Sequence, residues 1–125
     1  MRHDEDRIQA AIVAWARLVA PSAVIFAVPN GGRRDPREAA RLRMTGTLAG
    51  VPDVVIVHDG RALFIEVKTA SGRLSAVQVD MIARLRSSGA DVAVVRSVDE
   101  CRAAFANWGI VTRESVPAYA IGANP

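Results

Sequence analysis

The apolar residues of the first segment recur every three or four positions, at Ile8, Ile12, Trp15 and Val19. This spacing places them on one face of a helix, and Pro21 cannot continue that helix. The pattern predicts an amphipathic helix over residues 4–20 with acidic residues in its first turn. The apolar, β-branched run at 23–28 then predicts a short strand, which Pro29-Asn30-Gly31-Gly32 ends.

The middle of the chain reads as a short helix followed by a β-hairpin. Asp35-Pro36 has the order of an N-cap and a first helical residue, which predicts a helix over 37–44. Two apolar, β-rich runs at 51–57 and 62–67 are separated by His58-Asp59-Gly60-Arg61. Because Asp-Gly between such runs is a strong signal for a two-residue turn, we expect a hairpin here.

The last third of the chain predicts a helix, a strand and a second helix. Ser75 begins a helix to about residue 88, residues 91–96 form a strand, and either Ser97 or Asp99 caps a helix to about residue 108. Both faces of the hairpin strands are apolar, which favours a central sheet covered by helices on each side. We therefore predict an α/β fold with a mixed sheet.

The composition limits the classes of protein to which the chain can belong. With 125 residues, of which 50% are hydrophobic and 23% charged, the chain suits one globular domain. We assign this domain to residues 1–108 and expect 109–125 to be a tail, partly disordered or in a dimer contact. A single cysteine, Cys101, excludes an internal disulfide framework. No apolar run approaches the roughly 20 residues of a membrane span, so we expect a cytoplasmic protein without membrane contact.

The charge balance is mildly basic and carried by arginine. The formal net charge is +3 and the sequence pI is about 10, with Lys68 the one lysine in the chain. Such a surface favours polyanions such as nucleic acid, although a solvated surface without a partner fits the same excess equally well.

Two carboxylates are expected to meet in the hairpin. If Asp59 and Gly60 form the turn, pairing outward from His58 and Arg61 brings Asp53 opposite Glu66. Facing side chains project from the same side of the sheet with β-carbons about 5 Å apart, where like charges repel. A register slip of one residue would send these side chains to opposite faces.

A divalent cation is the natural compensation for this pair. Mg²⁺ or Mn²⁺ takes oxygen ligands, and the carbonyl oxygen of Val67 is a further candidate ligand beside Asp53 and Glu66. Lys68 lies two residues beyond Glu66 and so on the same side of the strand, where it would orient or deprotonate a water. The alternative is a structural ion-pair cluster, which is the costlier interpretation because it buries net negative charge.

These residues belong to a recognisable pair of motifs. Gly50-Val51-Pro52-Asp53 followed by Phe64-Ile65-Glu66-Val67-Lys68-Thr69 resembles the PD-(D/E)XK nucleases and, within them, the VRR-NUC family of short stand-alone proteins from phages and bacteria. Glu5-Asp6-Arg7-Ile8-Gln9 is similar to the family's opening helix, and Leu74-Ser75-Ala76-Val77-Gln78 to the helix after its catalytic strand. The resemblance covers about residues 5–100, including Asn30-Gly31-Gly32.

The resemblance implies a restriction-endonuclease-like core and assigns roles to five side chains. It makes Asp53 and Glu66 metal ligands, Lys68 the catalytic lysine, and Glu5 and Gln78 accessory active-site residues. Glu5 lies on the inward stripe of its helix, but it is also an acid in the first turn, where the helix dipole favours one. Gln78 stands three residues after Ser75, where a capping box would place it.

A basic segment follows the glycine loop. We predict that its members contact phosphates: Asn30, Arg33, Arg34, Arg37, Arg41 and Arg43. The alternative is a solvated, arginine-rich helix.

The sequence therefore predicts a Mg²⁺- or Mn²⁺-dependent DNA endonuclease. The resemblance further implies a homodimer acting on branched DNA such as Holliday junctions, with a single-site nickase of linear DNA or a catalytically silent DNA-binding module as alternatives. Opposed carboxylates repel phosphate, which argues against the silent module. The candidate dimer contacts are the apolar positions of the last helix and tail, Phe105, Trp108, Ile110, Val111 and Tyr119, unless they pack back on the domain's own core.

Overall fold

Four helices and four strands make up the part of the chain that the computed structural model describes, residues 2–29 and 35–115. In chain order these are α1 (Arg2–Val19), β1 (Val24–Ala27), α2 (Pro36–Met44), β2 (Val54–His58), β3 (Arg61–Val67), α3 (Ala76–Ser87), β4 (Asp91–Val95) and α4 (Val98–Asn107). Each predicted element is present. None of the described helices is long and apolar enough to cross a bilayer.

Side-chain caps set where three of the helices begin. The side chains of Asp35, Ser75 and Ser97 each accept a hydrogen bond from the backbone N–H three residues further on, at the starts of α2, α3 and α4. Each cap satisfies one backbone donor that has no partner within its helix. Ser97, rather than Asp99, is therefore the cap of the last helix.

The hairpin has the predicted register. Asp59 and Gly60 both have positive φ, 50° and 74°, as a tight two-residue turn between antiparallel strands requires. Pairing runs outward from His58 and Arg61 to Val54 and Ile65. The next pair outward would be Asp53 and Glu66, so the turn places the two carboxylates where the sequence predicted them.

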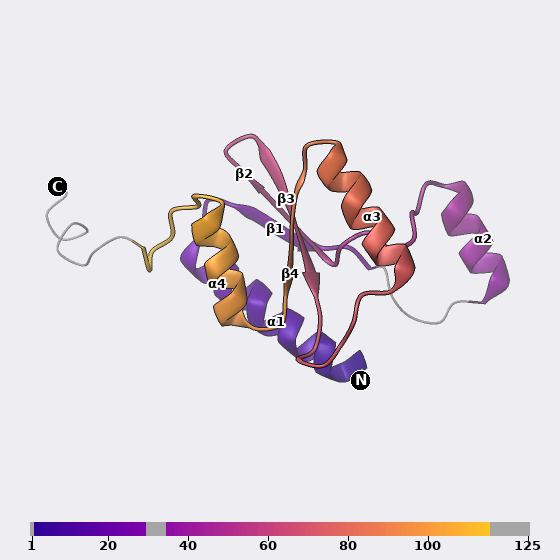
Figure 1. Cartoon of the computed structure of the whole chain (residues 1–125), viewed down its shortest axis with the longest axis horizontal. Coiled ribbons are helices and arrows are strands. Elements are labelled where there is room, and N and C mark those ends of the chain that lie inside the picture. The colour runs from indigo at the N-terminus through magenta and orange to yellow at the C-terminus, as the bar shows by residue number, and fades with distance from the viewer. Residues whose placement is uncertain (1, 30–34, 116–125) are drawn as a thin grey trace, which may run out of the picture.

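The four strands form one mixed sheet in the order β1-β2-β3-β4. The β1–β2 and β2–β3 pairs are antiparallel, whereas β3 and β4 are parallel and α3 connects them. Helices α1 and α4 lie on one side of the sheet and α3 on the other (Figure 1). The predicted α/β fold with a mixed, helix-flanked sheet is confirmed.

The main core lies between the sheet and helices α1 and α4. Alternate residues of the strands point into it, and it contains Ile12, Ala16, Ala20, Ile25, Val54, Ile56, Leu63, Ile65, Val67, Val95, Cys101, Phe105 and Ile110. Trp15 and Trp108 pack against this cluster, and the Trp15 and Phe105 ring centroids are 5.0 Å apart. Both tryptophans are thus part of the domain's own packing.

The opposite face of the sheet is only partly covered. Helix α3 packs on β4, with Met81 and Ile82 buried. On the β1–β2 side of this face, Val24 is 60% exposed, Phe26 43% and Val57 41%. The described helices therefore leave the β1 end of this face uncovered, whereas Val55 of β2 is buried.

Helix α2 packs against none of the other described helices and strands, and Figure 1 shows it standing away from the sheet. None of its residues is buried. Isolated helices of this length have marginal stability in water. Packing within the described domain therefore does not account for the presence of α2.

Arginine side chains bond to both outer edges of the sheet. The Arg17 guanidinium donates to the carbonyl oxygen of Ile25 on β1 at 2.8 and 3.3 Å, and Arg86 donates to that of Val92 on β4 at 2.7 Å. These carbonyls lie on the terminal strands, where sheet pairing leaves backbone groups without a strand partner.

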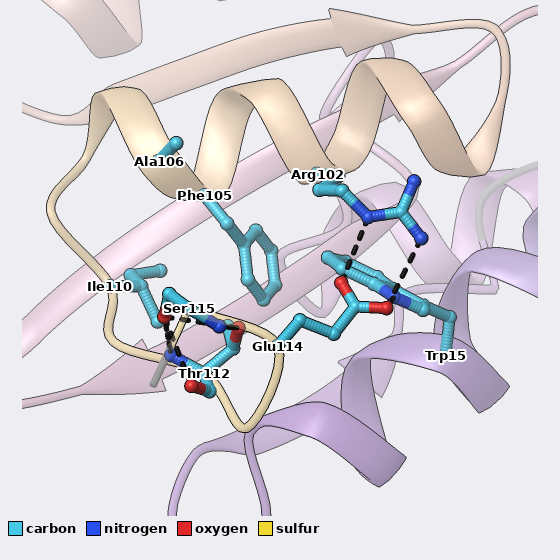
Figure 2. A pocket seen from close by; sticks show the side chains of 8 residues that line it. All are labelled: Trp15, Arg102, Phe105, Ala106, Ile110, Thr112, Glu114 and Ser115. Atoms are coloured by element: carbon cyan, nitrogen blue, oxygen red, sulfur yellow. Dashed lines mark hydrogen bonds and ion pairs between the residues drawn. The ribbon is translucent and has the colours of Figure 1, made fainter. Parts of the chain in front are cut away.

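The segment after α4 packs back on the domain. Ile110 is buried in the core, and the N–H of Arg113 donates to the carbonyl oxygen of Val19 at 2.8 Å. Figure 2 shows Arg102 lying over the Trp15 ring while its guanidinium pairs with Glu114. These contacts hold residues 110–115 against α1 and α4.

This packing corrects the candidate dimer contacts. Phe105 and Ile110 are buried in the domain's own core and Trp108 packs on it partly buried, which is the alternative that the sequence left open. Val111 is 68% exposed. Tyr119 lies outside the described residues.

Candidate active site

Glu66 is an ionisable side chain buried on the sheet's partly covered face. It is 1% exposed, because it lies near the end of β3 beneath the start of α3. Its Oε2 accepts a hydrogen bond from the side-chain amide of Gln78 at 3.3 Å. Its Oε1 is buried without a hydrogen-bond partner among the described residues. A carboxylate oxygen in that state is strongly unfavourable unless another group binds it.

Asp53 lies immediately before β2, at the point where the hairpin strands end. Its Oδ2 accepts a hydrogen bond from the backbone N–H of Val67 at 2.8 Å. Its carbonyl oxygen accepts from the N–H of Val28, also at 2.8 Å, which extends the β1–β2 ladder by one pair. The Asp53 carboxylate is thereby held across the end of β3, beside Glu66.

Lys68, the one lysine of the chain, brings an ammonium group to these carboxylates. Its Nζ lies 4.0 Å from Glu66 Oε2, and the side chain is nearly buried. Its backbone N–H donates to the carbonyl oxygen of Val95 at 3.0 Å, which continues the β3–β4 pairing past the end of the strand. The strand alternation that places Glu66 on this face therefore also places Lys68 there.

The electrostatics of the site are unbalanced. The pKa of Glu66 is raised from 4.5 to about 8, chiefly by burial and next by the Asp53 carboxylate, while Lys68 acts in the opposite direction. Glu5 adds a smaller upward contribution from the first turn of α1. One ammonium thus does not compensate the negative charge gathered here.

These features fit a divalent cation. A hard cation would bind the unpartnered Oε1 of Glu66 and reverse the cost of ionising it beside Asp53. The described residues contain no group of three His, Cys, Asp or Glu side chains arranged to hold a metal ion. Two carboxylates would therefore need further oxygen ligands, such as a backbone carbonyl, water or a substrate phosphate.

Gln78 completes a capping box and also contacts Glu66. Its amide oxygen accepts from the N–H of Ser75 at 2.9 Å, and the Ser75 hydroxyl accepts from its N–H at 3.2 Å, which completes a capping box. The same amide donates its N–H to Glu66. One side chain therefore joins the start of α3 to the acidic site.

Glu5 is half-buried on α1, and its charge acts on Glu66. This is the smallest of the effects on the pKa of Glu66, and an acid in the first turn also suits the helix dipole.

Arg96 belongs to the surroundings of the site, and the sequence pattern did not reveal it. Its Nη1 donates to the carbonyl oxygens of Thr69 and Gly72, at 2.5 and 2.6 Å, and so clamps the turn that follows Lys68. The one available signal was a charged residue directly after the apolar run of β4.

The arginine segment is divided by the limits of the described residues. Arg37, Arg41 and Arg43 lie exposed on α2. Asn30, Arg33 and Arg34 lie outside the described residues. The structure brings none of the three described arginines into a contact with Asp53, Glu66 or Lys68.

Comparison with known proteins identifies the family. The model of the VRR-NUC domain matches residues 2–99, which span the hairpin, α3 and both motifs. The chain belongs to the VRR-NUC domain family. As a VRR-NUC domain it is a nuclease that acts on DNA, and the family resemblance of its sequence is confirmed.

Two solved structures share the fold. One, described as a VRR_NUC domain protein, superposes with a TM-score of 0.69 at 22% identity, over 84% of this chain and 87% of the other. The second, described as a VRR_NUC domain, gives 0.61 at 21% identity, over 84% and 97%. No curated protein matches the chain.

Proposed function

We propose that this VRR-NUC domain is a DNA endonuclease that depends on Mg²⁺ or Mn²⁺ and uses Asp53, Glu66 and Lys68. The observation that carries the proposal is the buried Oε1 of Glu66, which has no hydrogen-bond partner among the described residues and lies beside a second carboxylate. A binding module has no use for such a costly arrangement, whereas a metal-dependent nuclease requires it.

Each side chain has a distinct task in this proposal. Asp53 and Glu66, with the carbonyl oxygen of Val67, would hold the metal, which when bound activates water and polarises the scissile phosphate. The Lys68 ammonium, 4.0 Å from Glu66, orients the attacking water or stabilises charge on the phosphate. Gln78 fixes the Glu66 carboxylate, and Glu5 adds negative charge to the site.

The direct test is to remove the carboxylate and measure metal binding. Glu66→Ala should abolish cleavage and reduce Mn²⁺ affinity in calorimetry, while DNA binding is retained. Asp80→Asn, a change of an exposed carboxylate on α3, is the matched control and should alter neither property. Equal Mn²⁺ affinity in wild type and Glu66→Ala would place the metal elsewhere.

The proposed substrate is branched DNA, cut by a two-fold symmetric homodimer. One domain offers one such site, and resolving a four-way junction needs two symmetric incisions, which a closed pair of chains supplies. Among the described residues of the last segment, the exposed Val111, which lies beside Pro21 and Ser22 just after α1, remains a candidate contact.

Sedimentation and cleavage assays test this proposal together. We expect a dimer at micromolar concentration that cuts four-way junctions in preference to linear duplex. A protein that stays monomeric with and without junction DNA, and that cuts one strand of linear duplex, would instead be a single-site nickase.

A further inference from the structure

An aromatic side chain on the uncovered part of the sheet lies beside the proposed site. Phe26 of β1 pairs with Val55 of β2, and Val55 pairs with Phe64 of β3. Facing residues of antiparallel strands project from the same side. Since Glu66 follows Phe64 by two residues, Phe26 and Glu66 lie on one face of the sheet.

The ring is close to the carboxylates along the strand direction. Two residues along β1 from Phe26, Val28 faces Asp53 across the strands. The Val28 N–H donates a hydrogen bond to the Asp53 carbonyl oxygen. Two residues of strand span about 7 Å. That distance is comparable with the spacing of neighbouring nucleotides in an extended strand, so a phosphate held at Asp53 would bring an adjacent base towards Phe26.

The described part of the molecule does not cover this ring. Phe26 is 43% exposed, and its neighbours on the same face, Val24 and Val57, are exposed as well. Helix α3 packs on β4, and α2 packs against no described strand (Figure 1). An exposed group of apolar side chains of this kind commonly marks a binding surface.

The occupant that suits this position is a nucleobase. Every base presents a flat π face, and a phenylalanine ring stacks on it irrespective of sequence. Whatever contacts Phe26 must approach the face that carries Asp53 and Glu66, as the DNA substrate does. A second copy of the chain seated there would obstruct that approach.

We propose that Phe26 is a stacking platform for one unpaired base next to the phosphate that is cut. The inference rests on the proposed nuclease function and specifies its substrate class. A base in a duplex is stacked on its neighbours, and displacing it costs free energy that an unpaired nucleotide does not require. Phe26 therefore favours DNA with unpaired nucleotides at the cleavage position, as at a branch point.

Cleavage of two matched substrates tests the proposal. One is a fully paired duplex, and the other is the same duplex with a short unpaired segment in the cut strand. Phe26→Ala should lower kcat/KM on the second substrate by about 5- to 100-fold, with little change on the first. Phe26→Trp should restore it. Leu18→Ala, which trims an exposed apolar side chain of α1 on the other side of the sheet, should leave both rates unchanged.

A binding measurement separates this idea from the nuclease function itself. In the Glu66→Gln background, a fluorescent 2-aminopurine in the unpaired segment should be quenched on binding, and adding Phe26→Ala should abolish the quenching. That readout needs no cleavage, so a wild type without metal-dependent cleavage would count against the proposed function alone. Equal losses on both substrates, unchanged quenching, or a monomer–dimer shift caused by Phe26→Ala would each overturn the stacking role, the last in favour of an interface between copies.

Discussion

The side chain of Gln78 bonds at once to the start of its own helix and to the carboxylate of Glu66. Its amide oxygen accepts from the Ser75 N–H at 2.9 Å, and its amide nitrogen donates to Glu66 Oε2 at 3.3 Å. The capping box thus fixes the amide in the orientation that presents a donor to the buried acid.

Gln78→Glu should separate the two roles, because glutamate also serves in a capping box but cannot donate to a carboxylate. We expect helix α3 to keep its cap while kcat/KM for DNA cleavage falls by about 10- to 100-fold, as for the loss of a hydrogen bond to a charged group. Thermal unfolding and single-turnover cleavage measure the two effects.

Ser75→Ala is the matched control, since it removes the hydroxyl cap but keeps the amide that reaches Glu66. It should cost about 0.5–2 kcal/mol of stability and leave most of the activity. If both variants lost activity in equal measure, Gln78 would act only through the helix.

The raised pKa of Glu66 predicts how stability varies with pH in the metal-free protein. Between its ordinary value of 4.5 and about 8, the folded carboxyl keeps a proton that the unfolded chain releases. The free energy of unfolding therefore falls as the pH rises through this window, by up to about 1.4 kcal/mol per pH unit. Urea unfolding in chelator at about pH 5, 7 and 9 should show the fall.

Glu66→Gln should remove that pH dependence, since its amide does not ionise. Mn²⁺ should raise the Tm of the wild type near pH 8, where the ion binds the folded carboxylates, but should leave the variant almost unchanged. A wild type whose stability rose over the same window would contradict the raised pKa.

Arg96→Ala should impair cleavage more than DNA binding. The variant loses two hydrogen bonds from a partly buried guanidinium to the carbonyls of Thr69 and Gly72, which costs about 1–3 kcal/mol and frees the turn after Lys68. We expect a lower kcat with a nearly unchanged KM, and a partial recovery in Arg96→Lys.

The control for this change is Arg102→Ala, which removes an exposed arginine paired with Glu114. Solvent screens an exposed ion pair, so this variant should be at most slightly less stable and fully active. Equal kcat values in Arg96→Ala and wild type would show that the clamp does not position Lys68.

The arginines of α2 should act through phosphate contacts. Each phosphate neutralised contributes about −0.9 to the slope of log K against log salt on duplex DNA. The double variant Arg37→Ala with Arg41→Ala should flatten that slope in fluorescence anisotropy, whereas Arg84→Ala on α3 should not. An unchanged slope in the double variant would make α2 an ordinary solvated helix.

Local chemistry made the hairpin and its carboxylates predictable. Asp59-Gly60 fixes the turn, the turn fixes the register, and the register brings Asp53 to Glu66 without any knowledge of the rest of the fold. The capped starts of α2, α3 and α4 are local in the same sense, because each depends on a side chain and a backbone group three residues apart.

What the sequence could not provide depends on contacts between distant segments. The alternation in β1 shows that Ile25 and Phe26 point to opposite faces of the sheet. It does not show that, at β1, the described helices cover the side chain of Ile25 and leave that of Phe26 exposed. The contact of Arg96 with Thr69 spans 27 positions and leaves no periodic signal. Ile110 follows the last helix without any pattern, and its burial depends on how α1 and α4 meet.

The arginines on the two outer strands bear on how this protein behaves at high concentration. A strand from another molecule could extend the sheet only by bonding to the free edge of β1 or β4, where Arg17 and Arg86 already bind the carbonyls of Ile25 and Val92. Displacing either guanidinium would cost hydrogen bonds before any new pair formed. Folded copies should therefore resist joining into continuous sheets and fibrils.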